Sequence, residues 1–495
     1  MKNSKFNEIK KLLKNEGNKW RAEHTTIIKS GANIGNTKVD YPKFYEVGDV
    51  LKKHVTFCTI GEDEKELDGS PLYHYDPDEG IYTTATKVID DLITTFDKRI
   101  NKQGRGEIRE YLRIKSPERK LTNSTNLIIV GNGIVKLDTM ELLPFSKKYV
   151  FTNKIITDYN SNANEPSFNG WKFSEWLKDL SNGDEKKHLL LWQMIASVIR
   201  GQTGLMYLFV DNGQGRTGKG TLQLLLEQLV GKNNCRSLTF EQFDDKHVLA
   251  HGYGARLIIG DDNNPKAFIK GGSNLKSIVT NESVLIDPKF EKPFTGRFNA
   301  VVIQSINGLP NFSDTSGGLY RRFRMIYFDH QFPEDRESKL IKDKYIKNPV
   351  LLRWILKKAL TIDIGEIANP SESKELVEET RIANDPVAYF LQAYLPKLKS
   401  EKIPSSFLFQ LYLAVMRREN NPQRISQRKF TKDIRPKMEA LGWEYKNNGS
   451  RAGSSFDKAD IDLFEDYRPH YGVGSEIKFY LKDIRDSKEG LFIKK

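Results

Sequence analysis

Strongly apolar runs alternate with segments of helical or loop character between residues 205 and 330. Four of these runs are rich in β-branched and aromatic residues, and they read LMYLFV, RLIIGDD, NAVVIQSI and RMIYFD. Such runs favour strands, and strands that alternate with helices are typical of a sheet with covering helices. The pattern therefore predicts a central α/β domain within a multidomain α/β protein.

Weaker patterns precede this block. Residues 1–45 are polar and basic with a short helical pattern, which indicates a basic arm or a small helix. Apolar spacing from Thr84 to Leu112 predicts two helices separated by a loop at Gly104 to Gly106. Residues 126–139 predict a β-hairpin with an Asn-Gly turn, and the polar stretch Asn160 to Ser167 predicts a linker. The N-terminal region is thus expected to be α+β.

Helical patterns flank the central block on both sides. They cover Trp171 to Arg200 and, further along, the stretch VLLRWILKKAL that ends near Asp363. A charged segment then leads to a final domain, whose boundary we place near residue 375. We therefore expect three domains, over residues 1–160, 168–370 and 376–495.

The composition supports several packed cores and narrows the class of protein. The chain has 495 residues, of which 38% are hydrophobic and 11% aromatic, so extensive disorder is excluded. Lysine and arginine outnumber aspartate and glutamate by 78 to 65, and the net charge of +13 would attract polyphosphate or an anionic membrane surface. Charge alone does not separate a nucleic-acid partner from a merely soluble basic protein.

Two cysteines, Cys58 and Cys235, lie far apart and outside any metal-like spacing with histidine. They support neither a disulfide framework nor a zinc site, and they fit a reducing cytosol. The longest apolar run, Leu189 to Ile199, is too short to span a bilayer, and the first residues carry no apolar segment of signal-peptide length. We therefore expect a cytoplasmic protein that has no membrane partner.

The segment from Gly213 to Thr221 carries the clearest chemical motif. It lies between the expected strand LMYLFV and the helical run LQLLLEQLV, as a phosphate-binding P-loop requires. Its glycines let backbone N–H groups turn toward phosphates, the following helix offers its positive end, and Lys219 reaches the outer phosphates. The alternative is a glycine-rich turn that binds nothing, which the flanking strand and helix disfavour. The expected nucleotide-binding residues are Gly213, Gln214, Gly215, Arg216, Thr217, Gly218, Lys219, Gly220 and Thr221.

One position departs from the usual P-loop pattern. Gly220 stands where a magnesium-binding Ser or Thr ordinarily follows the lysine, and the hydroxyl comes one residue later at Thr221. We therefore name Thr221 as a candidate ligand of Mg²⁺.

Paired carboxylates follow the next strong strand. The run RLIIG ends in Asp261 and Asp262, and an ATPase uses carboxylates at a strand end to hold magnesium and to polarise water. We assign Asp261 to the metal and Asp262 to the attacking water. An ordinary acidic turn would be the better interpretation of the pair alone, but the preceding P-loop favours the catalytic one.

Three further polar residues complete the expected site. Asn307 follows the strand AVVIQSI and is a candidate sensor of the γ-phosphate, with a plain Asn-Gly turn as the alternative. Arg321 and Arg322 precede the strand MIYF, and an arginine at a subunit edge can stabilise transition-state charge on a neighbour's ATP. This role implies a ring, whereas the alternative is a solvated surface arginine.

Residues 275–294, between the carboxylates and Asn307, have a helical start followed by two β-like runs around a Pro-Lys-Phe sequence. We expect a projecting hairpin whose Lys289, Phe290 and Lys292 meet the phosphates and bases of a DNA strand. An exposed charged turn is the alternative.

The order of these motifs resembles the core of superfamily 3 helicases, which belong to the AAA+ class. The blocks YHYDPDEGIY, NGIVKLDT, GQGRTGKGT, LPNFSD and GLYRRF also resemble the poxvirus-type and phage or plasmid primase-helicases, over roughly residues 70 to 335. In overall pattern the chain is most similar to the replication initiator helicases of staphylococcal pathogenicity islands. The resemblance implies a hexamer that uses ATP and Mg²⁺, loads at an origin and moves 3′ to 5′ along a strand in its channel.

The final domain resembles a winged helix, which would bind duplex origin DNA. Its expected helices cover Val387–Lys397, Ser405–Arg418 and Ser426–Leu441, with β-like pieces near Trp443–Lys446 and Ile477–Leu481. We expect Pro436 to break or kink the third helix. Basic residues crowd that helix, and without the family resemblance a solvated basic helix would be the better interpretation. They are Arg424, Arg428, Lys429, Lys432, Arg435 and Lys437.

These features favour an ATP-dependent replicative DNA helicase and replication initiator of a mobile element, which forms a homo-hexamer and works with a host- or element-encoded primase and polymerase. A nucleotide-switched origin-binding protein without unwinding activity is the alternative, and a packaging or partitioning motor ranks last. The only tempting acidic pair for a primase, Asp76 and Asp78, falls in an expected turn. We therefore interpret the N-terminal domain as an oligomerisation or DNA-handling collar.

Overall fold

The computed structural model divides the chain into two compact units, Met1–Val377 and Glu378–Lys495. Each is described by itself. Among the described residues, no helix combines the length and the apolar character needed to cross a lipid bilayer. The structure describes residues 5–61, 71–122, 125–201, 204–211, 213, 215–264, 268–269, 272–289, 293–312, 317–333, 336–418, 425–449, 457–467 and 489–495.

Four helices begin the first unit and share an apolar core that includes Leu13, Leu51 and Leu92. The expected loop at Gly104 to Gly106 is wrong, because both glycines lie inside α4. The side chain of Asn101 accepts a hydrogen bond from the Gly104 N–H (2.9 Å), so the helix begins before the glycines rather than after them. The four helices are α1 (Lys5–Glu23), α2 (Phe44–His54), α3 (Thr86–Phe96) and α4 (Lys102–Lys115).

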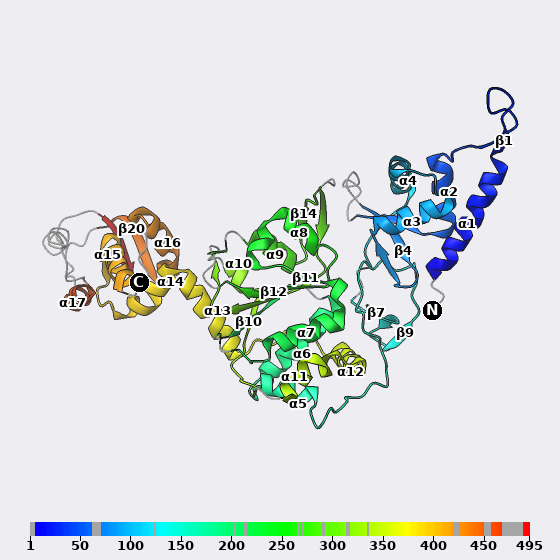
Figure 1. The fold of residues 1–495 in the computed structure, drawn as a ribbon. Coiled ribbons are helices and arrows are strands. Elements are labelled where there is room, and N and C mark those ends of the chain that lie inside the picture. Colours follow the sequence, from blue (N-terminus) through cyan, green and yellow to red (C-terminus); the bar gives the residue numbers. More distant parts are fainter. Residues whose placement is uncertain are drawn as a thin grey trace. The chain divides into compact units, whose positions relative to one another are not determined.

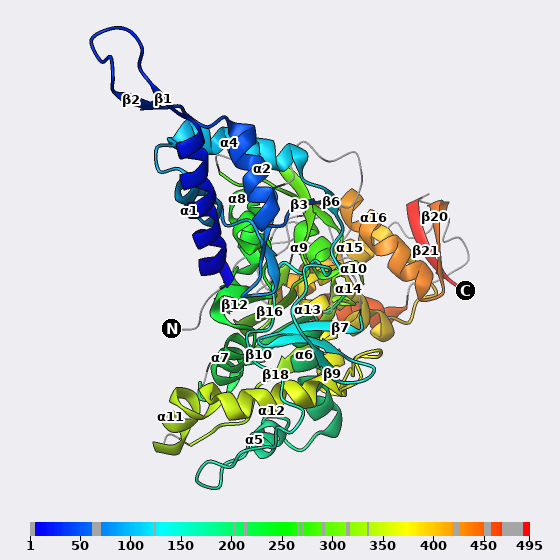
Figure 2. The same cartoon turned by 90° about the vertical axis from the view of Figure 1, so that its right-hand side faces the viewer.

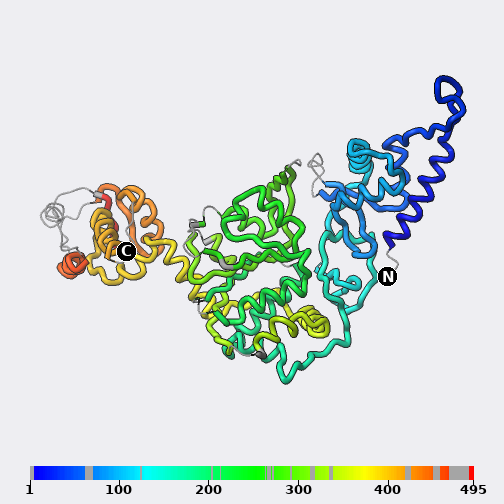
Figure 3. The backbone as a smooth tube through the Cα atoms, in the orientation of Figure 1, coloured from blue at the N-terminus to red at the C-terminus, as the bar shows by residue number. Residues whose placement is uncertain are grey.

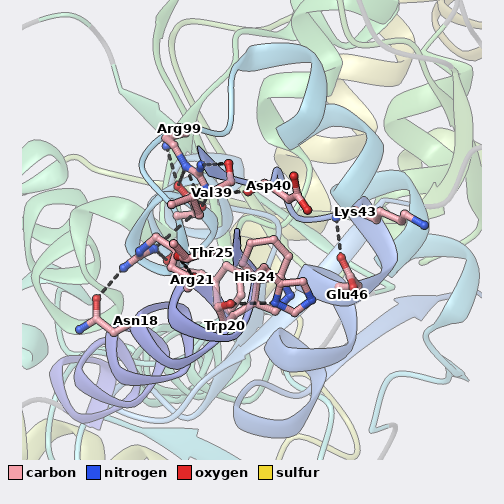
Figure 4. A network of polar contacts seen from close by, with 12 residues as sticks. Asn18, Trp20, Arg21, His24, Thr25, Val39, Asp40, Lys43, Glu46 and Arg99 are labelled. Carbon is pink, nitrogen blue, oxygen red and sulfur yellow. Dashed lines mark hydrogen bonds and ion pairs between the residues drawn. The ribbon is translucent and has the colours of Figure 1, made fainter. Parts of the chain in front are cut away.

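The backbone trace shows α1 leading directly into a hairpin, β1 (Thr25–Ile27) and β2 (Thr37–Val39) (Figure 3). Figure 4 shows how the return strand of this hairpin is anchored: the Arg99 guanidinium donates to the carbonyl oxygens of Val39 (3.1 Å) and Asp40 (2.9 Å). The same side chain pairs with the buried Asp97 carboxylate, which holds the pKa of that carboxyl below its usual range against the effect of burial. The expected short N-terminal helix is therefore a longer helix followed by a hairpin.

Two small sheets follow in the N-terminal part. The predicted hairpin at residues 126–139 is confirmed, and a third strand extends it. The expected Asn-Gly turn is wrong, because Val130 pairs with Gly133 and the two residues of the turn are Gly131 and Asn132. The Asp76 carboxylate accepts hydrogen bonds from the N–H groups of Asp78 (2.9 Å) and Glu79 (3.0 Å), so this acidic pair lies in a turn, as expected. One sheet has the order β5-β4-β3-β6 and the other β7-β8-β9. Their strands are β3 (Phe57–Ile60), β4 (Leu72–Asp76), β5 (Ile81–Thr83), β6 (Glu118–Arg119), β7 (Leu127–Val130), β8 (Gly133–Lys136) and β9 (Glu141–Leu143).

The expected linker at Asn160 to Ser167 contains no helix or strand, but it packs against the rest of the unit. Tyr159 and Ala163 are buried, and the Lys357 ammonium donates to the Ala163 carbonyl oxygen at 3.0 Å. The segment is therefore a loop packed on the central domain.

A five-stranded parallel sheet forms the centre of the first unit, with the order β11-β12-β16-β10-β18. Strand β16 lies between β10 and β12 in the sheet, although β10, β11 and β12 all precede it in the sequence. The chain therefore crosses back over the sheet before it forms β16. The parallel direction brings the carboxyl ends of all five strands to one edge. The strands are β10 (Met206–Asp211), β11 (Cys235–Ser237), β12 (Leu257–Asn263), β16 (Val301–Asn307) and β18 (Phe323–Tyr327).

Helices cover both faces of this sheet, as the two views in Figures 1 and 2 show. Each face is packed by its own apolar cluster, because alternate residues of a strand point to opposite faces. The helices on one face are α5 (Phe173–Leu180), α6 (Glu185–Arg200), α7 (Lys219–Val230), α11 (Arg336–Asp343) and α12 (Pro349–Leu360). On the other face lie α8 (Lys246–Gly252), α9 (Ser273–Val279) and α10 (Gly317–Tyr320).

Smaller elements connect these layers. The predicted hairpin between the carboxylates and Asn307 is confirmed as an antiparallel pair. It consists of β14 (Ser283–Ile286) and β15 (Phe294–Arg297). The remaining elements of this unit are β13 (Phe268–Ile269), β17 (Asn311–Phe312) and the 3-10 helices η1 (Lys232–Asn234), η2 (Phe240–Asp244) and η3 (Tyr345–Lys347).

Helix α13 (Ser371–Asn384) spans the boundary, and in the second unit four further described helices share an apolar core with a three-stranded antiparallel sheet of order β19-β21-β20. The expected break at Pro436 is wrong: α16 continues through it, because buried residues on both sides of it, Ile434 and Met438, keep the helix on the core. The predicted strand at Ile477 to Leu481 lies outside the described residues. The elements are α14 (Pro386–Tyr394), η4 (Leu395–Lys397), β19 (Lys402–Pro404), α15 (Ser405–Arg418), α16 (Gln427–Ala440), β20 (Trp443–Gly449), α17 (Lys458–Asp466) and β21 (Glu489–Lys494).

Candidate active site

The expected P-loop connects β10 to α7 at the carboxyl edge of the central sheet. Three of its glycines have positive φ angles, at Gly213 (78°), Gly215 (74°) and Gly218 (81°), and Gly218 is the N-cap of α7. Arg216 also has a positive φ of 54°, an uncommon conformation for a residue with a side chain. The backbone thus turns sharply enough to present N–H groups beside the positive end of a helix. Gln214 lies outside the described residues.

Lys219 begins α7 and is almost completely buried. Its ammonium lies 3.0 Å from the Asp211 carboxylate and 3.2 Å from the Asn307 amide oxygen. Lys219 is 8% exposed and Asp211 4%, so water screens this ion pair little. Two of the predicted site residues, Lys219 and Asn307, are therefore in direct contact.

Strand geometry explains why these side chains converge. Asp211 and Asn307 are register partners at the ends of β10 and β16. Along β16, Val301 and Ile303 face the core on the α7 side of the sheet. Because every second side chain of a strand points to the same face, Ser305 and Asn307 also lie on the α7 side. Ser305 accepts a hydrogen bond from Gln223 of α7 at 2.6 Å, which fixes α7 against the strand beneath the P-loop.

A cavity of about 490 Å³ opens over the P-loop. Lys219 and Asn307 line one part of it, and the stacked rings of Trp176 and Phe332, 6.2 Å apart, line another. The Phe332 N–H donates to the Arg216 carbonyl oxygen at 3.0 Å, so the segment after β18 is fastened to the P-loop. An apolar wall beside a lysine and backbone N–H groups suits a ligand with a flat ring and a phosphate chain.

Asp261 lies within β12, two residues before its end at Asn263, and its side chain is exposed. Burial raises the pKa of the Glu227 carboxyl of α7, the Lys232 charge opposes this rise, and the Asp261 charge adds to it. The pairing of β12 with β16 shifts between Gly260 and Asn263, so the carboxylates lie in a bulge. The side chain of Asp262 lies outside what the structure describes.

Gly260, just before the carboxylates, tolerates no side chain. A Cβ there would meet Gln304 Oε1 and would lie 2.6 Å from the Leu238 carbonyl oxygen. The close approach of β12 and β16 at this point therefore depends on glycine.

The residues suited to hold Mg²⁺ fit only part of a binding site. Thr221 lines the cavity, but Asp261 is not among the residues that line it, and the described residues contain no group of three His, Cys, Asp or Glu side chains that could hold a metal by themselves. A hard cation that binds one hydroxyl and one carboxylate would need phosphate oxygens or water for the rest. Such a site fits a metal that arrives with its nucleotide.

The structure does not bring Arg321 and Arg322 into this cavity. Phe323, the residue after them, pairs with Met206, the first residue of β10. The two arginines therefore lie at the opposite edge of the sheet from Asp211. Arg322 donates to the Gly318 carbonyl oxygen, whereas Arg321 is exposed. Neither can reach a phosphate bound to its own P-loop.

Lys289 lies exposed in the turn of the β14–β15 hairpin. The hairpin is fastened to α8 by an ion pair between Lys246 and Asp287 (2.6 Å). Phe290 and Lys292, the other predicted DNA-contacting residues, lie outside the described residues.

The basic residues of α16 divide into two groups. Arg428, Lys429 and Lys432 are exposed. In contrast, Arg435 pairs with Glu439 (2.8 Å) and Lys437 pairs with Asp385 (2.7 Å), so these two cations stabilise the unit. Arg424 lies outside the described residues.

The sequence analysis missed several residues of the cavity, among them Asp211, Trp176 and Phe332. Asp211 stands two positions before the first glycine of the motif, where the P-loop pattern imposes no residue type. Trp176 and Phe332 come from segments far apart in the chain, and only the tertiary fold brings them together. A strand-terminal carboxylate followed at once by a P-loop was the available signal for Asp211.

Three family models match separate stretches of the chain. Residues 6–181 match a model described as D5 N terminal like, and residues 382–469 match one described as Poxvirus D5 protein-like. Residues 212–322, which hold the P-loop, match a family of unknown function, DUF5906. The two D5-like matches thus lie before and after the central sheet in the sequence.

The chain is also similar to solved structures of the NrS-1 C terminal region. An apo structure of that region matches with 15% sequence identity and a TM-score of 0.49, over 84% of this chain and 98% of the other. Its A form apo structure matches with 14% identity and a TM-score of 0.48, over the same shares of the two chains.

Proposed function

We propose that this protein is an ATP-dependent DNA helicase and replication initiator of a mobile element, which works as a ring of identical subunits. The observation that carries the proposal is the meeting of Lys219 with the strand ends at Asp211 and Asn307 beneath a cavity lined by the P-loop. Two further features support it: the sheet order β11-β12-β16-β10-β18, which suits an AAA+ core of the superfamily 3 type, and the D5-like flanking domains.

In the proposed site, Lys219 and the P-loop N–H groups bind the outer phosphates of ATP, and Trp176 with Phe332 packs against the base. Mg²⁺, held by Thr221 and Asp261, would neutralise phosphate charge. Asp262 accepts a proton from the attacking water, and Asn307 orients that water or the γ-phosphate.

The position of the arginine pair supports a ring. Because Arg321 and Arg322 lie at the far edge of the sheet from their own P-loop, they suit the site of a second copy, where a guanidinium stabilises charge in the transition state. A closed ring satisfies every such head-to-tail contact. A hexamer moving 3′ to 5′ is what the resemblance implies.

The DNA contacts are assigned to two elements. Lys289 on the β14–β15 hairpin would touch the phosphates of a single strand in the channel. In the second unit helices pack against an antiparallel sheet, which supports our interpretation of this unit as a winged helix; Arg428, Lys429 and Lys432 of α16 would then contact duplex origin DNA.

Unwinding of forked DNA with 3′ or 5′ tails tests the proposal, with ATP hydrolysis followed in the same reactions. We expect ATP-dependent unwinding by the native chain, and hydrolysis without unwinding in Lys289→Ala. Lys246→Ala, which removes a cation at the base of the same hairpin, is the matched control. Hydrolysis without unwinding by the native chain would instead favour a nucleotide-switched origin-binding protein.

A further inference from the structure

Asp211 is the last residue of β10 and contacts the P-loop through both carboxylate oxygens. One oxygen, Oδ1, accepts the backbone N–H of Gly213 at 2.9 Å, and the other, Oδ2, lies 3.0 Å from the Lys219 ammonium. The side chain is 4% exposed, so it is held inside the protein rather than in solvent.

Both partners of Asp211 are groups that a P-loop offers to phosphate. Phosphate oxygens bind the ammonium of the motif's lysine and the N–H groups of its glycine-rich turn. In this structure the Asp211 carboxylate contacts one group of each kind. Like phosphate, a carboxylate is an oxygen anion that accepts charge-assisted hydrogen bonds. The Asn307 amide oxygen takes a further contact with the Lys219 ammonium, at 3.2 Å.

A phosphate that binds Lys219 must therefore share or displace an anion that is already there. Like charges at such short range in a poorly screened site repel each other strongly. The opposite role is also conceivable for a carboxylate in this place: it could hold Lys219 in position and so assist phosphate binding. The two roles predict opposite changes in nucleotide affinity when the charge of Asp211 is removed.

We propose that Asp211 is an internal competitor of the nucleotide phosphates: its carboxylate occupies Lys219 and the Gly213 N–H, and so sets the affinity of the site. The proposal rests on the proposed nucleotide-binding function. It makes Asp211 an affinity-determining residue that acts through Lys219. Nucleotide exchange is then faster than the P-loop alone would allow, since the carboxylate replaces the departing phosphate.

Asp211→Asn removes the charge and keeps an oxygen that can accept the Gly213 N–H. Asp158→Asn is the matched control, because Asp158 forms an ion pair with Arg353 (3.1 Å) outside the cavity. Dissociation constants for ADP and inorganic pyrophosphate, each with Mg²⁺, would be measured by calorimetry on the full chain. We expect both ligands to bind Asp211→Asn at least about tenfold more tightly than the native chain, and Asp158→Asn to bind them as the native chain does.

Steady-state kinetics supply a readout that a merely structural residue would not move. Asp211→Asn should lower the KM for ATP and, where release of ADP limits turnover, lower kcat as well. If Asp211→Asn does not fold, Asp211→Ser, which also lacks the charge and can accept the Gly213 N–H, takes its place. Unchanged or weaker binding in a folded variant overturns the proposal. Absence of nucleotide binding by the native chain is a different result, which overturns the proposed function itself.

Discussion

Lys219 and Asp211 form a buried ion pair, so the loss of one partner leaves the other as an unpaired charge inside the protein. We predict that Lys219→Ala abolishes ATP hydrolysis and also lowers the free energy of unfolding by about 3 kcal/mol. The double variant Lys219→Ala with Asp211→Asn should recover most of that stability while staying inactive. Thermal unfolding of the three proteins measures this, and a double variant as unstable as the single one would contradict it.

His74 is buried in the N-terminal part, and neither ring nitrogen has a hydrogen-bond partner among the residues that the structure describes. Burial lowers the pKa of His74 to about 4 from an ordinary 6.5, so between these values the unfolded chain binds the proton that the folded chain rejects. Stability is therefore lost as the pH falls from about 6.5 toward 4. Between pH 7 and pH 5 the loss from this residue is about 2 kcal/mol.

The variant His74→Leu should remove that part of the pH dependence. The unfolding temperature of the native chain would be compared with that of the variant at pH 7 and pH 5. His251→Gln is the control, because His251 is exposed. An equal loss of stability on acidification in His74→Leu would show that another group is responsible.

At the level of elements, helix α6 is the most deeply buried helix beneath the central sheet, and it begins with a side-chain cap. The Asp184 carboxylate accepts the N–H groups of Lys186 (2.7 Å) and Lys187 (3.0 Å). We predict that Asp184→Ala lowers the free energy of unfolding by about 1 kcal/mol, whereas Asp184→Asn, which can also cap, changes it by a few tenths. Chemical denaturation checks both, and equal losses would exclude a capping role.

The sequence predicted the elements that have a strong local pattern. Four of the five strands of the central sheet, the helix after the P-loop, the hairpin of β7 and β8 and the β14–β15 hairpin follow from periodicity or turn residues, whereas the short strand β11 was not predicted. Lys219 and Asn307 were each expected at the outer phosphates of a nucleotide, but their direct contact was not predicted. It follows from the parallel pairing of β10 with β16, which brings the ends of these strands to one edge.

The errors have a common physical cause, namely that tertiary packing outweighed a local signal. Gly104 and Gly106 were expected to form a loop, but burial of Ile108 and Leu112 keeps them in α4. Pro436 stays in α16 for the same reason. The pairing of Trp176 with Phe332 has no local signal at all, because it joins residues on two distant segments.

For the whole molecule, a site shared between copies predicts complementation. Lys219→Ala and Arg321→Ala should each be inactive alone, since one lacks the P-loop lysine and the other the guanidinium offered to its neighbour. Mixed in equal amounts and allowed to reassemble, they should recover about a quarter of native ATP hydrolysis, the share of interfaces at which both residues are present. No recovery in rings shown to be mixed would contradict an arginine that acts on the neighbouring subunit's ATP.

The tight approach at Gly260 also bears on how this protein can vary over generations. Any side chain there would press on Gln304 and on the Leu238 carbonyl oxygen, and so displace β12, the strand that carries Asp261. In a library of random substitutions, position 260 would be depleted as strongly as the P-loop lysine, although a hydrogen atom is its whole side chain. A map of the positions that tolerate no substitution would therefore group Gly260 with the active-site residues, although Gly260 does not contact the substrate.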